Sequence, residues 1–356
     1  MSYRILNIKE KKEWTNILGK LSLDQQDIYY TPEYYELCEI NGDGQAICFV
    51  LEKDEDIAMY PFLMNSVNNL GYDLDNTYYD IQGAYGYNGW VCSSLSSDFL
   101  RELSNSFTNY CHHNNIIAEF TRFNPVITNH MYSEYLNIVK TNRDIILNVQ
   151  HSEKHTWENI YDHSVRKNVK KAMRSGLIVN IYSGDDISEY WSKQFTNIYT
   201  STLKRRNADK FYYFSEKYFS LMNKLLRDNV IYFFTVKDDI VISCELVTIK
   251  NNNAYSFLGG TLSEYFPYRP NDLLKHEIIN YLRSINVKNF CMGGGSEDGD
   301  GIYKYKKSFS KNGSTDFFIG KKIYNEKIYN KICQEWMIKN PKKIKDYENI
   351  LLKYRE

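Results

Sequence analysis

The chain has 356 residues, of which 43% are hydrophobic and 25% are charged, and its 44 basic residues balance its 44 acidic residues. This composition is typical of a folded soluble protein, and it excludes a disordered chain or one whose overall charge attracts nucleic acid. The length favours two domains over one.

Seven cysteines are scattered along the chain, mostly inside apolar runs and never as a CxxC pair. They predict small core residues in a reducing compartment, without disulfides or a metal site. No apolar run approaches the ~18–20 residues of a transmembrane helix, and the N-terminal segment lacks a signal-peptide core. We therefore expect a cytoplasmic protein with no metal and no tightly bound cofactor.

The first half of the chain begins its regular pattern with a hairpin. Residues 46–67 read as two apolar strands joined by an acidic turn. A strand at 78–81, a helix at Ser97–His113 and a strand at 116–120 are predicted to follow. Together these elements form a mixed α/β unit with one crossover helix.

The second half repeats this order. Residues 230–250 form another hairpin pattern, followed by a strand at 254–258, a helix at 271–283 and a strand at 287–292. The order and spacing of the elements predict two tandem copies of one α/β unit with mixed sheets. A Rossmann array is excluded, because it needs more strand–helix alternations and a GxGxxG turn.

Domain boundaries follow from this repeat. The polar stretch at 141–158 has no periodicity, so we place the N-terminal domain at 1–150 and the C-terminal domain at 151–335. A helical tail at 336–356 is expected to pack against a domain or cap it.

The loop after the predicted strand at 78–81 carries aromatic rings among glycines. The text YYDIQGAYGYNGW puts Asp80 at a strand end and Tyr85, Gly86 and Tyr87 in the loop, an arrangement that suits a sugar or a base. Glu119 and Arg122 end the next strand. Arg122 is suited to a phosphate or a carboxylate, and an ion pair with Glu119 is the structural alternative.

Two basic segments are candidate polyanion sites. The predicted helix 164–176 turns Arg166, Lys170 and three further cations outward, which favours the phosphates of a nucleotide, coenzyme A or RNA; a solvated helix face is the alternative. Arg205 lies in a basic triplet ahead of an aromatic cluster, a mixture that also suits a polyanion or simply a surface next to a core.

The second crossover helix follows a glycine pair. Gly259 and Gly260 end a strand, and Asn271 is expected to cap the helix, whose free N–H groups can hold a pyrophosphate or a carboxylate. Glu277 lies beside the apolar stripe of this helix. It is either paired structurally or kept as an acid, base or orienting group.

The stretch NFCMGGGSEDGDGIYKYKKSF at 289–309 looks least like plain scaffold. A strand runs into Gly293, Gly294 and Gly295, and such a run marks a sharp turn or a backbone that lies against a ligand. After an acidic loop, Tyr305 and Lys306 place a cation among aromatic rings. A flexible loop with a solvated basic stretch is the alternative.

These segments, with LGGT and RPNDLLKHE between them, resemble in their order the Fem-type acyltransferases of the GNAT superfamily, in the branch met beside cell-surface polysaccharide genes. The resemblance covers residues 29–324. It implies two GNAT-like domains that face a shared cleft and transfer an acyl or aminoacyl group to an amine. Lys306, after the aromatic Tyr305, matches the lysine that stabilises charge on the attacked carbonyl, and Tyr85, Gly86 and Tyr87 match the loop that lines the acceptor groove.

The sequence departs from the family in three respects. The long coiled-coil insertion of some members is missing, Asn88 and Trp90 stand where a glycine and a proline are expected, and the Q/RxxGxG/A pyrophosphate signature is absent. The donor is therefore open between an acyl-CoA thioester and an aminoacyl-tRNA.

Our leading hypothesis is transfer of an acyl group from acyl-CoA to the amine of a nucleotide-linked amino sugar. Lys306 and N–H groups at residues 293–295 would stabilise the oxyanion, and Glu277 or Asp80 would orient or deprotonate the amine. An aminoacyl-tRNA-dependent transferase and a non-catalytic sugar- or RNA-binding protein are the alternatives. The oligomeric state is left open.

Overall fold

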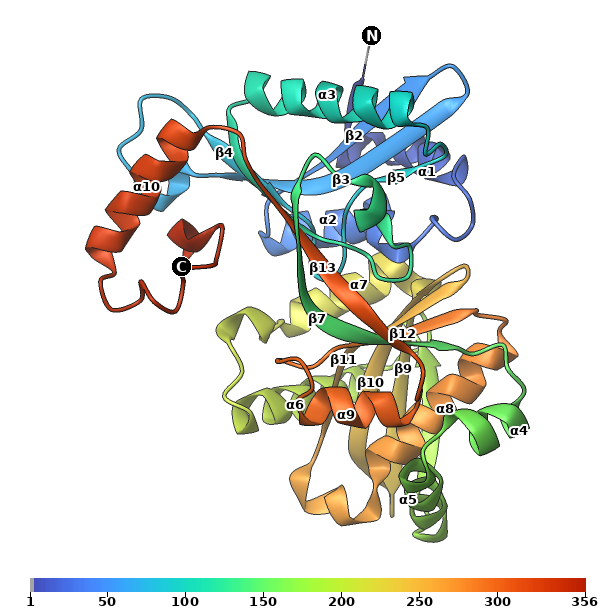
Figure 1. Ribbon diagram of the computed structural model, residues 1–356. Helices are drawn as coiled ribbons and strands as arrows, with labels where there is room; N and C mark the ends of the chain where they lie inside the picture. The colour runs from blue at the N-terminus through green and yellow to red at the C-terminus, as the bar shows by residue number, and fades with distance from the viewer. Residues whose placement is uncertain (1–2) are drawn as a thin grey trace. The chain divides into compact units, whose positions relative to one another are not determined.

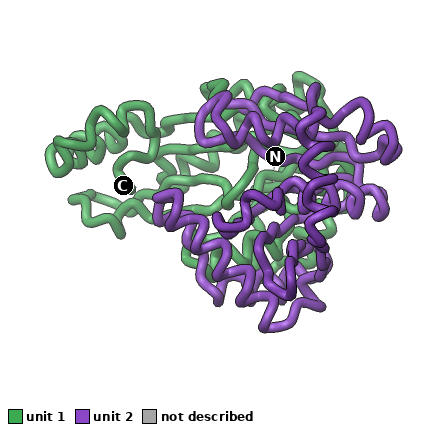
Figure 2. Tube along the Cα trace, turned by 90° about the horizontal axis from the view of Figure 1, so that it is seen from below, with its two compact units in different colours: residues 1–141, 318–356 green, residues 142–317 purple. Residues whose placement is uncertain are grey.

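The computed structural model describes residues 3–356, which form two compact units (Figure 2). Unit 1 comprises Met1–Thr141 and Phe318–Glu356, and unit 2 comprises Asn142–Phe317. The division differs from the predicted domains, because residues 318–335 join the first unit. Among the described residues, no helix has the length and apolarity that crossing a membrane requires.

Unit 1 is built on a mixed sheet in the order β1-β2-β3-β4-β6-β13, with β5 paired to β3. Only the β4–β6 pair is parallel. The elements of the unit are β1 (Arg4–Asn7), α1 (Lys11–Gly19), α2 (Pro32–Asn41), β2 (Gln45–Lys53), β3 (Asp56–Ser66), β4 (Tyr79–Gln82), β5 (Val91–Cys92), α3 (Ser97–His113), β6 (Ile116–Arg122), the 3-10 helix η4 (Asn129–Tyr132), β13 (Ser314–Ile323) and α10 (Glu326–Lys339).

Helices cover both faces of the unit 1 sheet. The ring of Phe107 on α3 meets Phe49 of β2 at a centroid distance of 5.2 Å, and Figure 1 shows α3 running along β2 and β3. On the other face, the Tyr35 hydroxyl of α2 donates to the Pro61 carbonyl of β3 at 2.9 Å. The alternating direction of side chains along each strand supplies both apolar faces.

Unit 2 has the corresponding sheet, in the order β7-β12-β11-β10-β9-β8, with only β11–β12 parallel. Its elements are β7 (Asn137–Asn148), α4 (Glu153–His155), the π-helix η5 (Thr156–Ile160), α5 (His163–Arg174), β8 (Ile178–Ser183), α6 (Glu189–Arg205), α7 (Glu216–Leu226), β9 (Val230–Lys237), β10 (Ile240–Lys250), β11 (Asn253–Thr261), the 3-10 helix η8 (Ser263–Tyr268), α8 (Pro270–Ser284), β12 (Asn289–Gly293) and α9 (Gly301–Ser308).

The alternation along β9 shows how this sheet is sandwiched. Ile231 and Phe233 join the core cluster that includes the apolar stripe of α8, whereas Tyr232 faces Phe195 of α6 at 5.1 Å. Consecutive side chains therefore reach helices on opposite faces of the sheet.

The two units repeat one another, as the sequence predicts. In each, an antiparallel pair leads through a third antiparallel strand and a crossover helix (α3 or α8) to a parallel strand. The strand that follows each parallel strand then adds to the sheet of the opposite half: β7 pairs with β12, and β13 pairs with β6. The fold is therefore α/β, with two tandem copies of one mixed-sheet unit.

Most predicted elements are confirmed, and the helix Ser97–His113 has the predicted bounds. The cysteines are buried and free. Three expectations differ. The lysine-rich stretch after the acidic loop, predicted only as an aromatic and basic segment, forms the helix α9. The polar stretch at 141–158 contains the end of β7, and the expected helical tail at 336–356 is helical only to Lys339 and in the short 3-10 helix Lys353–Arg355.

Candidate functional site

Helix α9 places Lys306 in unit 2. Its N-cap is Asp300, whose carboxylate accepts hydrogen bonds from the backbone N–H of Tyr303 at 2.7 Å and of Ser296 at 2.9 Å. These backbone donors, led by Tyr303, lower the pKa of Asp300. The charged cap fixes the start of a short helix that has little intrinsic stability, and it thereby fixes the position of Lys306.

The glycine run receives the Lys306 side chain. The ammonium donates to the Gly294 carbonyl at 2.7 Å. A Cβ on Gly294 would lie 2.5 Å from the Arg143 carbonyl oxygen and 3.0 Å from Asp144 Oδ1, and Gly293 has a φ of +69°. The run is therefore a turn with close backbone approach, and it leaves a carbonyl for the lysine to bind.

The Lys306 ammonium lies in an unusual environment for a lysine. Burial, and next the positive charge of Lys275, lower its pKa to about 8, against the opposing effect of Asp144. A lysine with this pKa carries a proton at neutral pH and can release it easily, as a group that stabilises or protonates a developing anion requires.

Sequence analysis missed the neighbouring ion pair. Lys275 of α8 and Glu245 of β10 are 3% and 9% exposed and form a salt bridge, and Ser256 of β11 donates to Glu245 at 2.6 Å. The signal in the sequence is a glutamate inside the apolar run of β10 and a lysine inside the apolar stripe of α8. Charged groups are rarely buried without a partner, so either residue predicts the other.

Tyr305 ties α9 to the first turn of α8. Its hydroxyl donates to the Asn271 carbonyl at 2.9 Å, and burial raises its pKa. Asn271 is not the helix cap that the sequence suggested, because the N-cap position belongs to Arg269. The Asn271 side chain instead accepts hydrogen bonds from Ser243, at 2.7 Å, and from Thr261.

Close packing explains why β11 has glycine at positions 259 and 260. A Cβ on Gly260 would lie 2.7 Å from the Ile198 carbonyl oxygen of α6, and one on Gly259 would lie 2.8 Å from the Cys244 carbonyl oxygen. Both glycines let backbone approach the strand that leads to α8. Their predicted contact with a donor stays a prediction.

Glu277 lies on a different side of α8 from Lys275. Two residues span about 200° around a helix, so the two side chains diverge. Glu277 is half-buried, and burial, followed by the charge of Glu153, raises its pKa. A raised carboxyl pKa suits an acid or base, and the influence of Glu153 places Glu277 toward α4.

The basic helix lines a pocket of about 560 Å³, together with the start of α8. Asn168 of α5 donates to Asp272 of α8 at 3.1 Å, which brings the two elements together. We call this the basic pocket; its lining residues are His163, Arg166, Lys167, Asn168, Lys170, Lys171, Arg174 and Arg269. The lining carries no carboxylate, so it attracts anions, and Arg269 is a member that sequence analysis did not identify.

Two of the predicted phosphate ligands also have partners in the protein. Arg166 donates to the Tyr161 carbonyl at 2.8 Å, and Lys170 lies over the Trp157 ring at 5.8 Å. Arg205, at the end of α6, lies outside this lining, with its guanidinium 5.0 Å from the ring centroid of Phe266.

In unit 1, Asp80 is held by the C-terminal segment. Its carboxylate accepts hydrogen bonds from Tyr354 at 2.8 Å and from Arg355 at 2.7 Å. Burial raises the pKa of Asp80, and Arg355 opposes that shift. The partners explain this buried charge structurally.

Glu119 is held by three tyrosines. It is fully buried and accepts hydrogen bonds from Tyr60 at 2.7 Å, Tyr135 at 2.8 Å and Tyr324 at 2.6 Å. Burial raises its pKa and these donors oppose the shift. Arg122 is exposed at the end of β6, and Ile319 of β13 pairs with it.

The Tyr85–Tyr87 loop packs on α2 and the segment before it. Tyr34 donates to the Tyr85 carbonyl, Gly86 has a φ of +108° with no room for a Cβ beside the Tyr29 ring, and the Tyr87 ring meets Tyr29 at 5.4 Å. The glycine is therefore needed for the loop itself, and a role in acceptor binding stays a prediction.

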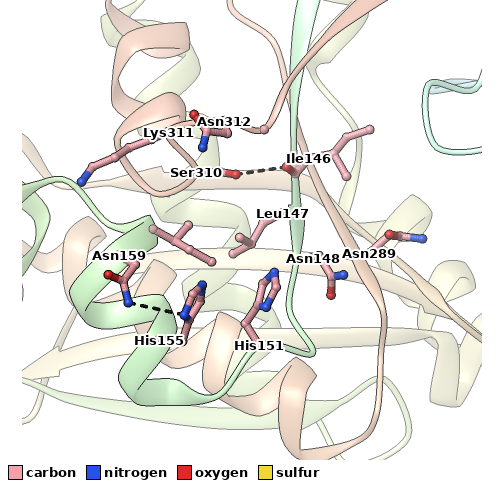
Figure 3. A pocket seen from close by; sticks show the side chains of 12 residues that line it. Ile146, Leu147, Asn148, His151, His155, Asn159, Asn289, Ser310, Lys311 and Asn312 are labelled. Carbon is pink, nitrogen blue, oxygen red and sulfur yellow. Dashed lines mark hydrogen bonds between the residues drawn. The ribbon is translucent and has the colours of Figure 1, made fainter.

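A further polar pocket, of about 500 Å³, lies in unit 2 (Figure 3). His155 faces Asn159 at 3.4 Å, and Ser310 donates to the Ile146 carbonyl at 3.1 Å. Its remaining polar lining comes from Asn148, His151, Asn289, Lys311 and Asn312. None of the residues singled out from the sequence lines it.

Comparison with known proteins adds a family to this geometry. Residues 162–307 match the model of the acetyltransferase (GNAT) domain, and this range contains Lys306, the ion pair and the basic pocket. The matched range covers most of unit 2. The enzyme class is therefore acyltransferase. No curated protein matches the sequence.

Solved structures share the tandem architecture. FemX is 12% identical, with a TM-score of 0.67 over 93% of this chain and 99% of its own. A tandem GNAT protein from the clavulanic acid biosynthesis pathway is 7% identical, with a TM-score of 0.53 over 90% and 98% of the two chains. The C-terminal domain of a putative lysylphosphatidylglycerol synthetase from Agrobacterium fabrum is 12% identical, with a TM-score of 0.54 over 89% and 92%. These likenesses concern the fold.

Proposed function

We propose that this acyltransferase moves an acyl group from an acyl-CoA thioester to the amine of an amino sugar, with a nucleotide-linked sugar of cell-surface polysaccharide synthesis as the expected acceptor. The observation that carries the proposal is Lys306, a cation with a lowered pKa on the Gly294 carbonyl, inside the range that matches the GNAT domain. The sugar is proposed from the sequence resemblance.

The chemistry needs orientation and charge stabilisation. The neutral amine attacks the thioester carbonyl, the oxyanion forms, and its collapse expels the thiolate of coenzyme A while the amine loses a proton to solvent. In this proposal the Lys306 ammonium stabilises the oxyanion or protonates the thiolate. The basic pocket holds the donor phosphates, with Arg269 and Lys167 among its cations.

The proposal assigns no carboxylate as general base. Asp80 is committed to Arg355, and Glu277 is influenced by Glu153 rather than by a group of the Lys306 environment. The variant Glu277→Gln tests whether Glu277 is a general base. Loss of a general base would lower kcat on the order of 10²-fold, whereas loss of an orienting residue would lower it far less.

The test is the turnover of Lys306→Ala with a panel of acyl-CoAs and amino sugars, measured as the release of free coenzyme A thiol. We expect kcat to fall on the order of 10²-fold with an unchanged melting temperature, by comparison with loss of one oxyanion donor. Lys304→Ala is the matched control, because Lys304 lies on the same helix and is exposed. Equal turnover in both variants would remove Lys306 from the mechanism.

An aminoacyl-tRNA donor is the second candidate, and the basic pocket favours it, since RNA phosphates bind to the same cations. Lys167→Glu with Lys171→Glu discriminates the donors. If the donor is an aminoacyl-tRNA, its binding weakens steeply as the salt concentration rises, and this salt dependence is less steep in the double variant. If the donor is an acyl-CoA, the double variant has a higher KM for acyl-CoA, and ribonuclease does not affect the activity.

A further inference from the structure

Unit 1 has a pocket that the proposed reaction does not use. Its volume is about 410 Å³, within the range of small-molecule sites, and it lies between the first turns of α3 and the segment around η4. We call it the α3 pocket. The lining residues that bear on a ligand are Trp90, Leu95, Ser97, Arg101, Ser104, Met131 and Glu134.

The wall of the α3 pocket contains an unsatisfied donor. Trp90 is 1% exposed, and its indole N–H has no hydrogen-bond partner among residues 3–356. Two other buried indoles differ: Trp14 donates to the Tyr30 carbonyl at 2.8 Å and Trp336 to the Glu356 carbonyl at 3.1 Å. Native proteins rarely leave such a donor unpaired, so an acceptor on a ligand is the natural partner.

The duplication gives this place a counterpart. In unit 2, α9 follows the parallel strand and packs by Tyr305 on the first turn of α8, with Lys275 one turn further. In unit 1, η4 follows β6 in the same order, and the α3 pocket adjoins the equivalent turns of α3. Unit 1 therefore has a pocket at the position where unit 2 holds Tyr305 and Lys275.

The lining defines the ligand. The hydroxyls of Ser97 and Ser104 can donate and accept hydrogen bonds, and Leu95 and Met131, 62% and 70% exposed, offer a small apolar surface. Arg101 is paired with Asp98 at 2.6 Å and Glu134 adds a negative charge, which disfavours a polyphosphate. We propose that the α3 pocket binds an N-acylated sugar, whose amide carbonyl accepts from Trp90 and whose acyl methyl group contacts Leu95 and Met131.

The inference is independent of the reaction, so binding is measured directly on the full chain. Ligand-detected NMR and calorimetry compare N-acetylglucosamine with glucosamine, which lacks the acyl group, and with glucose. We expect N-acetylglucosamine alone to bind, and Lys306→Ala to bind it equally. Absent binding, or equal binding of glucosamine, overturns the proposal and leaves the proposed function intact.

Two variants locate the site. Trp90→Phe keeps an aromatic ring and removes the N–H, so we expect affinity to fall about tenfold, the effect of one hydrogen bond. Ser104→Leu, on a half-exposed helix position, fills the pocket and abolishes binding. Trp14→Phe is the matched control: it breaks a formed hydrogen bond and leaves affinity unchanged. If Trp90→Phe and Ser104→Leu both bind as the wild type does, the ligand lies elsewhere and the assignment fails.

Discussion

The Lys306 ammonium is anchored by one backbone carbonyl and weakened as a base by its surroundings. Its hydrogen bond to Gly294 fixes the geometry, while burial and Lys275 favour loss of the proton. The protonated form is the one that can stabilise an oxyanion. Activity should therefore depend on pH near the pKa of this single group.

We expect kcat/KM to fall as the pH rises through about 8, because deprotonation removes the cation. Lys306→Arg stays charged to far higher pH and should lose this alkaline limb, whatever its absolute rate. The measurement is a pH–rate profile of the wild type, of Lys306→Arg and of the exposed Lys304→Arg. An alkaline limb that persists in Lys306→Arg contradicts the assignment.

The buried pair Lys275–Glu245 gives a second prediction. Lys275→Met leaves an uncompensated carboxylate, so the free energy of unfolding should fall by about 3–5 kcal/mol. The double variant Lys275→Met with Glu245→Leu should recover much of the loss. Urea denaturation measures the free energy of unfolding of each single variant, Lys275→Met and Glu245→Leu, and of the double variant. If the effects of the two single substitutions simply add in the double variant, the residues do not interact.

Residue identity predicted part of the candidate site. The glycine run and the resemblance point to Lys306 and Tyr305, whereas Lys275 and Glu245 lie in apolar patterns that single out neither residue. The role of Asp80 could not be interpreted from its strand, since its partner Arg355 lies about 275 residues further along the chain. Pairs made by tertiary contact leave no local pattern in the sequence.

At the scale of elements, glycines set the spacing between α6 and β11. Gly260→Ala would bring a Cβ to 2.7 Å from the Ile198 carbonyl oxygen, so we expect a loss of about 1–3 kcal/mol in the free energy of unfolding. Gly301→Ala is the control, because nothing lies within 4 Å and its φ is not positive. It should be neutral or slightly stabilising. Denaturant midpoints of the two variants decide the point.

Elements with a clear period were predicted well, and irregular ones were not. The helix Ser97–His113 shows an amphipathic pattern and a serine cap, so its bounds follow from the sequence. Helix α9 was missed because its lysines and tyrosines alternate and its start depends on the cap from Asp300. The N-cap of α8 was misplaced because Arg269 has a φ of +64°, which its residue type does not suggest.

At the scale of the whole molecule, the repeat was predictable and the partners of its last strands were not. The order of hairpin, strand, helix and strand recurs in the sequence. The pairing of β13 with β6 joins segments about 200 residues apart, which no local signal encodes. The C-terminal segment is therefore part of the first core, with Trp336 and Tyr354 buried beside Ile117.

Truncation after Phe317 should unfold unit 1 and spare unit 2. It removes the partner of β6 and leaves Asp80 without Arg355. Limited proteolysis should then digest residues 1–141 while 142–317 resist. A truncation after Asn325, which keeps β13, is the control and should protect unit 1 better. Equal protection of both units in the shorter chain would contradict this account.

The pairing of β13 with β6 also affects how the protein folds during its synthesis. On a translating ribosome, β6 emerges long before its partner β13, whereas unit 2 ends inside β13, so both halves become complete at nearly the same time. The first half, although made earlier, must wait with an open sheet edge until β13 emerges.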